Sequence, residues 1–294
     1  LSSAIEKNNN LEPLHWLATD SGAQVELLPV DGDGRLDIDA LQSSIARDPD
    51  SAAVVSVMWA NNETGALQPV ARLAELCAER GVPFHTDAVQ AFGKVHVRVD
   101  QLPVDLLSVS AHKLGGPRGT GALFVRSGVE LRPLLHGGRQ EHGLRPGTED
   151  VAGAVGLAAA AELAEAERGA ESARLRELRD RLQTALGLGF PGLRVHAAAA
   201  ERIPNLLNVS FPEVEAELLL PALDAGEIAA SGGSACASGA LRASHVLRAM
   251  GVAEEEGLRS VRFSLGSATT SEEIDRAIRL IPVLLEPLRT TCLA

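Results

Sequence analysis

The sequence has few cysteines, no long apolar run and a shortage of positive charge. Its three cysteines, Cys77, Cys236 and Cys292, are too few for a disulfide scaffold and too far apart for a zinc-binding motif. No apolar run reaches the roughly 20 residues that a membrane-spanning helix needs. The 27 basic residues against 39 acidic ones give a net charge of −12, which argues against nucleic acid as a direct partner. We therefore expect a cytoplasmic protein with no metal site and no membrane partner.

Lysine is the second scarce residue, because only Lys7, Lys94 and Lys113 stand among the 27 basic residues. Chemistry that requires an amine able to lose its proton cannot use arginine. Each lysine is therefore a candidate for such chemistry, with an ordinary surface position as the alternative for any one of them.

The first half of the chain alternates between short apolar runs and a helical pattern. Strands are expected at 53–58, 82–86, 104–110 and 121–125, and residues 69–80 carry apolar side chains at helical spacing. Strand, helix and strand at this spacing predict an α/β fold with a mainly parallel sheet flanked by helices. Because ligands bind beyond the carboxyl ends of parallel strands, the residues that follow each strand are candidates for function.

The character of the sequence changes near residue 149. Helices are expected at 149–167, 172–187, 213–224 and 271–289, and strands at 205–211 and 261–265. This order predicts a smaller α+β domain in the C-terminal part. We place the boundary near 160–170 and divide the chain into residues 1–165 and 166–294.

Two strand ends carry the residues of a possible cofactor site. Asp87 follows the strand at 82–86 and Lys113 follows the strand at 104–110, so both would project into one crevice. Pyridoxal phosphate needs such a pair, because an amine bonds its aldehyde and a carboxylate keeps a proton on its pyridine nitrogen. Ser110 and His112 flank the lysine and can donate to a phosphate. A helix cap at Asp87 and a solvated turn at Lys113 are the simpler alternatives.

The C-terminal part holds a second group of candidates. Residues 230–239 are small, glycine-rich and polar around Cys236, which predicts a mobile, exposed loop with a reactive cysteine. Arg262 stands inside an apolar strand, where a ligand carboxylate would be its natural partner and an edge position is the alternative. Thr148 is placed to cap the helix that follows it, and helix starts attract phosphate, although capping alone would explain this residue.

Five short motifs, taken together, resemble a known family. They occur in a suitable order and spacing at residues 61–65 (NNETG), 85–90 (HTDAVQ), 110–113 (SAHK), 145–148 (RPGT) and 231–236 (SGGSAC). The set resembles the cysteine desulfurases, which are pyridoxal-phosphate enzymes of the class V aminotransferase group. The resemblance extends from about Ser3 to about Leu288 and implies the fold-type I architecture for the large domain.

The resemblance implies a role for each motif residue. Lys113 would hold pyridoxal phosphate through a Schiff base and move the substrate's α-proton, and Cys236 would take the sulfur of L-cysteine and leave alanine. His112 would belong to both the catalytic and the cofactor-binding residues. The remaining roles are Asp87 at the pyridine nitrogen, Gln90 at the ring hydroxyl, Ser110 and His112 at the phosphate, Thr148 at the phosphate of the other subunit, Asn62 at cofactor and substrate carboxylate, and Arg262 at the substrate carboxylate.

The resemblance also predicts partners and alternatives. A homodimer with a shared active site would pass sulfur to an acceptor or scaffold protein for iron–sulfur cluster or thio-cofactor assembly, with tRNA thiolation as an indirect link to nucleic acid. The alternatives are a selenocysteine lyase, another class V enzyme, or a non-catalytic remnant that binds a scaffold or sister subunit. Two departures predict weak cofactor binding and turnover. Lys7 stands where the family usually has histidine, and the family's long initial segment with a Gly-Ala-Thr turn is not found.

Overall fold

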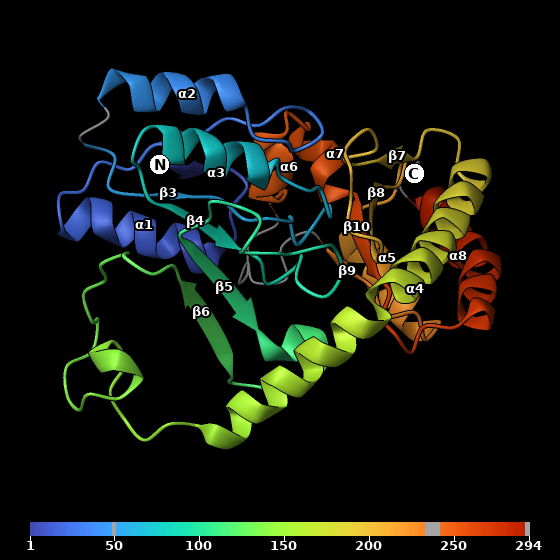
Figure 1. The fold of residues 1–294 in the computed structure, drawn as a ribbon. Coiled ribbons are helices and arrows are strands. Elements are labelled where there is room, and N and C mark those ends of the chain that lie inside the picture. Colours follow the sequence, from blue (N-terminus) through green and yellow to red (C-terminus); the bar gives the residue numbers. More distant parts are fainter. Residues whose placement is uncertain (49–50, 233–241, 292–294) are drawn as a thin grey trace.

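The computed structural model describes residues 1–48, 51–232 and 242–291, which form two β-sheets (Figure 1). The larger sheet has six strands in the order β2-β1-β3-β4-β5-β6. Strands β1 to β5 run parallel, and β6 is antiparallel to β5. The strands span Ser2–Ser3 (β1), Leu27–Leu28 (β2), Val55–Ser56 (β3), Phe84–Asp87 (β4), Leu106–Ser110 (β5) and Gly121–Val125 (β6). The prediction of a mainly parallel α/β fold is confirmed.

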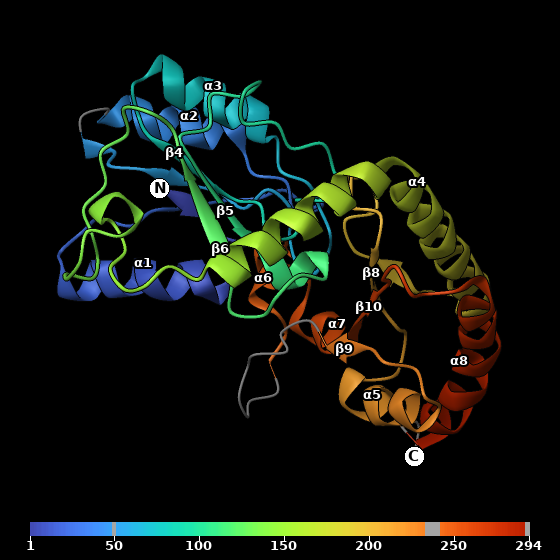
Figure 2. The ribbon, with the colours of Figure 1, turned by 60° about the horizontal axis from the view of Figure 1, so that its bottom comes forward.

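Helices cover both faces of this sheet. They span Asn8–Asp20 (α1), Ile38–Arg47 (α2) and Val70–Glu79 (α3). In both views α2 and α3 lie on one face and α1 lies on the other (Figure 1, Figure 2). Helix α2 begins after Asp37, whose carboxylate accepts from the main-chain N–H groups of Asp39 and Ala40. Helix α3 matches the helix expected at 69–80, and Gly81 follows it with a φ of +68°, the left-handed geometry that favours glycine.

The apolar core lies between the sheet and helices α2 and α3. Phe84 from β4, Leu41 from α2, and Leu73 and Cys77 from α3 are fully buried in it. Each fully buried side chain of this size contributes about 1.5–3 kcal/mol. Because side chains alternate along a strand, Asp87 points away from the side of Phe84, toward the face on which α1 lies.

A single helix of 39 residues, α4 (Val151–Gly189), connects the two sheets. The expected break between two helices at 167–172 was wrong, because that stretch holds one glycine, which costs only about 1 kcal/mol, and no proline. Thr148 as the N-cap was also wrong. Asp150 takes that position, and its carboxylate accepts from the N–H of Gly153 at 2.9 Å. Among the described residues, neither α4 nor any other helix is both long and apolar enough to cross a membrane.

The smaller sheet is antiparallel, with four strands in the order β7-β8-β10-β9. Its strands are Arg194–Val195 (β7), Leu206–Ser210 (β8), Ser231–Gly232 (β9) and Ser260–Ser264 (β10). The helices of this part are Ala216–Ala225 (α5), His245–Ala249 (α6), Glu254–Leu258 (α7) and Ser271–Thr291 (α8). Leu207, Phe211, Leu219 and Ile281 belong to its own buried core. The prediction of a smaller α+β part is confirmed.

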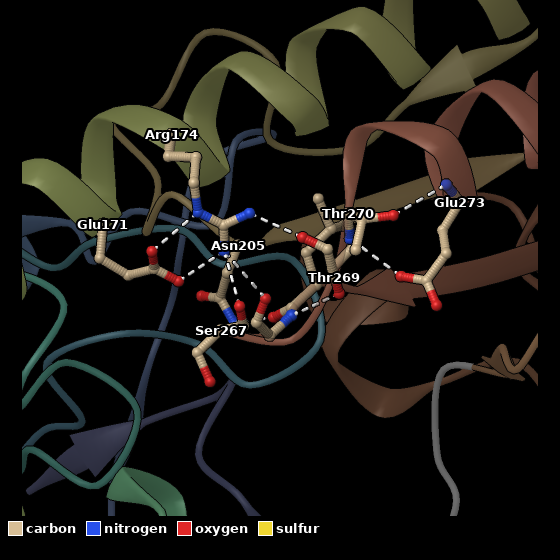
Figure 3. Close-up of polar contacts among 9 residues, drawn as sticks. Glu171, Arg174, Asn205, Ser267, Thr269, Thr270 and Glu273 are labelled. Carbon is tan, nitrogen blue, oxygen red and sulfur yellow. Dashed lines mark hydrogen bonds and ion pairs between the residues drawn. The ribbon is translucent and has the colours of Figure 1, made fainter.

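Arg174 fixes the second half of α4 to the loop between β10 and α8 (Figure 3). Its guanidinium donates to the carbonyl oxygens of Thr269 at 2.6 Å, Ser267 at 3.1 Å and Gly266 at 3.3 Å. The carboxylate of Glu171, one turn earlier, accepts from Arg174 at 2.7 and 2.8 Å and so orients the guanidinium. This contact holds the exit of β10 against α4.

The two sheets have separate cores, since no buried residue in the described part of the chain belongs to both. The proposed division into residues 1–165 and 166–294 falls inside α4. The division therefore stays a prediction, and it assigns the two halves of one helix to different domains.

Candidate active site

Asp87 ends β4 at the carboxyl edge of the larger sheet, where α1 begins. Its Oδ1 accepts from the N–H of Val89 at 2.9 Å, and its Oδ2 accepts from the side-chain amide of Asn9 at 3.3 Å. The carboxylate is buried and has lone pairs left for one more donor, such as the N–H of a ring. Asp87 pairs with Ser108 of β5, so the strand that leads to Lys113 lies directly beside it.

A tight turn after β3 carries Asn62. The side-chain oxygen of Asn61 accepts from the N–H groups of Glu63 and Thr64, both at 2.9 Å, and Gly65 takes a φ of +80° that favours glycine. The side-chain oxygen of Asn62 is buried and has no hydrogen-bond partner among the described residues. Because a buried, unpaired acceptor is costly, this atom marks a place where a ligand could donate.

A small pocket lies between these two strand ends. It is lined by Lys7, Asn9, Met58, Ala60, Asn62, Asp87, Val89 and Gln90. Three residues from two separate motifs therefore meet in one pocket: Asn62, Asp87 and Gln90. Their individual roles stay predictions.

Lys113 lies on one turn of 3-10 helix, η2 (Ala111–Leu114), directly after β5. Gly115 ends this turn with a φ of +81°, and the N–H of Gly116 donates to the carbonyl of Ala111 at 2.9 Å. The turn thus holds Lys113 at the same edge of the sheet as Asp87.

The first half of α4 packs closely on this turn because its contacting residues are small. A Cβ added to Gly156 of α4 would lie only 2.5 Å from Cγ of Pro117, and one added to Gly116 would lie 3.1 Å from Ala160. The many alanines and glycines at 149–167 therefore have a structural consequence. It lets the helix approach the segment that follows Lys113.

Lys113 shares its surroundings with other positive groups. Burial lowers the pKa of Lys113, and the charges of Lys7 and Arg262 lower it further. The pKa of His112 is lowered first by desolvation and then by the charges of Lys113 and Lys7. Nδ1 of His112 and the hydroxyl of Ser110 are 2.7 Å apart. Lys113 and His112 therefore both lose a proton more readily here than they would in water.

Arg262 lies on β10 and reaches the turn of Asn62. Its Nη1 donates to the carbonyl oxygen of Asn62 at 2.9 Å, and its Nε is buried without a hydrogen-bond partner among the described residues. Strand β10 lies between β8 and β9, so the alternative of an edge position is wrong. A guanidinium with an N–H to spare suits a ligand carboxylate.

Two buried carboxyl groups beside the pocket were missed in the sequence analysis. Glu6 accepts from the N–H of Met58 at 2.6 Å and from Asn10 at 2.8 Å, and burial raises its pKa to about 7. Glu63 accepts from the hydroxyl of Ser244 at 2.5 Å, and burial raises its pKa to about 7 as well. The available signal was position, since Glu6 precedes Lys7 and Glu63 lies within the NNETG motif.

Lys94 stabilises a turn that contributes to the pocket. Its Nζ donates to the carbonyl oxygen of Gln90 at 3.0 Å, which fixes the turn that carries Gln90. Burial lowers the pKa of Lys94 to about 8, and the charge of Lys113 contributes to the shift. Since Lys94 does not line the pocket, its amine stabilises the turn.

Among the predicted site residues that the structure describes, five do not line this pocket: Ser110, His112, Lys113, Thr148 and Arg262. Thr148 is exposed, in a segment after β6 that projects away from the sheet (Figure 1). Cys236 lies outside the described residues. The described chain on either side of it is near the site, because Ser231 of β9 pairs with Arg262 and Ser244 contacts Glu63.

Comparisons with known proteins agree with this architecture. The Aminotransferase class-V family matches residues 1–277. A cysteine desulfurase of Cereibacter sphaeroides is 45% identical over 289 residues, which are 98% of this chain and 73% of that protein. The cysteine desulfurase NifS of Azotobacter vinelandii is 44% identical over 98% of this chain and 71% of its own length. Among solved structures, a NifS-like protein from Rickettsia africae ESF-5 superposes with a TM-score of 0.88 at 29% identity, over 97% of this chain and 75% of that one.

Proposed function

Because this chain belongs to the class-V aminotransferases and removes sulfur from L-cysteine as a cysteine desulfurase, we propose that the reaction takes place at the pocket between β3 and β4. The observation that supports this most strongly is the meeting of Asp87 and Asn62 in one pocket, next to the strand that leads to Lys113. The pocket offers a buried carboxylate and an unpaired acceptor, and Lys113, an amine with a lowered pKa, lies at the same edge of the sheet.

Pyridoxal phosphate is the cofactor of this proposal, and the residues present fit its parts. Asp87 would hold the pyridine nitrogen, Gln90 the ring hydroxyl, and Ser110 with His112 the phosphate. The fit rests on the chemistry of this donor set and on the unpaired side-chain oxygen of Asn62. When bound, the cofactor withdraws electrons from the α-carbon of the substrate.

Lys113 is the residue that holds the cofactor and moves the α-proton in this proposal. Its lowered pKa raises the share of neutral amine near neutral pH. A neutral amine can bond an aldehyde carbon and can also accept a proton. His112, whose pKa is also lowered, would serve as a neutral partner for protons at the same edge.

Asn62 and Arg262 would bind the substrate carboxylate, and Cys236 would receive the sulfur. The Cys236 thiolate attacks the sulfur of cysteine, and an S–S bond forms while the substrate's C–S bond breaks. The electron pair of the broken bond stays with the carbon, which takes up a proton to give alanine. Cys236 is left as a persulfide.

The proposed assembly is a homodimer. Leu134 is 90% exposed and Val151 is 67% exposed, and the side chains of Val155 and Leu163 on α4 are also exposed to solvent. Since exposed apolar side chains of this size mark interaction surfaces, a second copy of the chain would cover them. Thr148, on the projecting segment, would then reach the phosphate site of the other subunit. A molar mass of twice 30.8 kDa in light scattering is the expected result.

The persulfide sulfur would pass to an acceptor or scaffold protein for iron–sulfur cluster or thio-cofactor assembly. A thiolate nucleophile has to stay reduced between turnovers, which agrees with a cytoplasmic setting. The net charge of −12 favours protein partners over direct contact with nucleic acid.

Alanine release from L-cysteine, measured with and without added pyridoxal phosphate, tests the function. Lys113→Ala is expected to lose both the visible absorbance of the bound cofactor and alanine release. Cys236→Ser is expected to keep the absorbance and lose persulfide formation, while Cys292→Ser serves as the matched control. A Cys236→Ser protein that releases alanine at the unaltered rate would overturn the proposed role of Cys236.

A further inference from the structure

Glu63, like Glu6, is a buried acid of the pocket region that has no role in the proposed reaction. It is 3% exposed and follows Asn62 in the turn after β3. Its N–H donates to the side chain of Asn61 at 2.9 Å, and its carbonyl oxygen accepts from the side chain of Asn208 at 3.2 Å. Because the backbone is held on both sides, the direction of the Glu63 side chain is fixed.

The carboxylate of Glu63 meets the hydroxyl of Ser244 at 2.5 Å. Ser244 caps α6, and its oxygen accepts from the N–H of Val246 at 3.0 Å. A hydroxyl has a single proton, and here that proton points to Glu63. The contact therefore ties the start of α6 to the turn that carries Asn62, across 181 residues of sequence.

Arg262 acts on Glu63 from the other side, through charge. Its positive charge lowers the pKa of Glu63, although burial has the larger, opposite effect. Among the described residues, no ion pair within 4.0 Å joins the two, and Arg262 donates to the carbonyl of Asn62 instead. Glu63 thus lies beside the two groups assigned to the substrate carboxylate and leaves the arginine free to bind it.

We propose that Glu63 is a positioning residue for carboxylate recognition, which together with Ser244 fixes the turn of Asn62 and so keeps Arg262 bound to the carbonyl of that turn. The inference rests on the proposed function, in which Asn62 and Arg262 bind the substrate carboxylate. Loss of the Glu63–Ser244 hydrogen bond releases the turn from α6. Binding of any amino acid carboxylate then weakens, while the steps after binding continue.

The test measures L-alanine binding to the holoenzyme by titration calorimetry, together with KM and kcat for L-cysteine. Glu63→Ala and Ser244→Ala each raise the alanine Kd and the KM by about tenfold, as expected for one lost hydrogen bond to a charged group. The kcat changes by less than about twofold. Glu63→Gln keeps an oxygen that accepts from Ser244 and holds both constants within about threefold of the unaltered protein.

Glu254→Ala is the matched control. The carboxylate of Glu254 accepts from the N–H of Ala243 at 2.8 Å, so it anchors the residue next to Ser244 without touching the turn of Asn62. This variant is expected to leave the alanine Kd unchanged. An equal loss in Glu254→Ala and Glu63→Ala would mean that Glu63 is merely structural, and it would overturn the proposal.

Arg262→Ala separates this inference from the proposed function. If Glu63 acts through Arg262, adding Glu63→Ala to Arg262→Ala changes the alanine Kd by less than about twofold. Two results overturn this inference alone. One is that the effects of the two substitutions on the alanine Kd add in full. The other is a normal alanine Kd in Glu63→Ala while Arg262→Ala binds alanine more weakly. A normal Kd in Arg262→Ala overturns the proposed role of Arg262, and the inference fails with it.

Discussion

Adding one methyl group at two glycines of α4 tests how this helix supports the Lys113 turn. A Cβ on Gly156 would lie 2.5 Å from Cγ and 2.9 Å from Cδ of Pro117, whereas a Cβ on Gly169 would meet no atom within 4 Å. Alanine is favoured over glycine inside a helix by about 1 kcal/mol at both positions. Forcing a methyl group into packed atoms costs about 1–3 kcal/mol, and only Gly156→Ala carries this cost.

Gly169→Ala should therefore raise the free energy of unfolding by about 1 kcal/mol, and Gly156→Ala should lie about 1–3 kcal/mol below it. Urea unfolding followed by far-ultraviolet circular dichroism measures the difference. Because Pro117 follows the turn of Lys113, Gly156→Ala should also weaken binding of pyridoxal phosphate, which a titration of visible absorbance reads independently. Equal stabilisation by both substitutions would refute the close packing of α4 on this turn.

Three further predictions concern Arg174, Glu6 and Lys7. Arg174→Ala removes three hydrogen bonds to the loop after β10 and should lower the free energy of urea unfolding by about 1–3 kcal/mol. An unchanged free energy of unfolding would contradict the stabilising role of Arg174. The folded-state pKa of Glu6, about 7, lies above the ordinary 4.5, so the folded state holds this proton more tightly and stability falls as pH rises through that range. Glu6→Gln should remove this loss, so its free energy of unfolding should rise by about 1–3 kcal/mol relative to that of the unaltered protein between pH 4.5 and pH 8. Parallel plots of unfolding free energy against pH for the two proteins would disprove this. Lys7→His adds a flat ring at the pocket and removes a charge near Lys113, so it should tighten pyridoxal phosphate binding about three- to tenfold in a fluorescence titration, with unchanged affinity as the contrary result.

The larger sheet and its functional edge could be predicted because their signals are local. Strands β3, β4 and β5 overlap the runs expected at 53–58, 82–86 and 104–110, and each run is followed within a few residues by a polar side chain of the site: Asn62, Asp87 and Lys113. Since β4 and β5 are neighbours, the two strand ends put Asp87 and Lys113 at one edge, as the sequence analysis expected.

Other parts of the molecule have no local signal. Helix α1 contains Pro13, begins with asparagines and has no fully buried side chain, so it lacks the apolar stripe by which helices are recognised. The burial of Glu6 and Glu63 depends on Met58 and Ser244, which are 52 and 181 residues away from them in the chain. A charged residue looks the same in a sequence whether water or a distant partner satisfies it.

Because α4 is one continuous helix, the number of residues between its contacts with the segments after β5 and β10 is constrained. Gly156 meets the segment after Lys113, Arg174 holds the loop after the strand of Arg262, and one uninterrupted helix sets the angle between them. Each residue inserted between these two positions would rotate Arg174 by about 100° around the helix axis and shift it by about 1.5 Å. One extra residue would turn the guanidinium away from its loop, whereas seven would return it to nearly the same side but about 10 Å farther along.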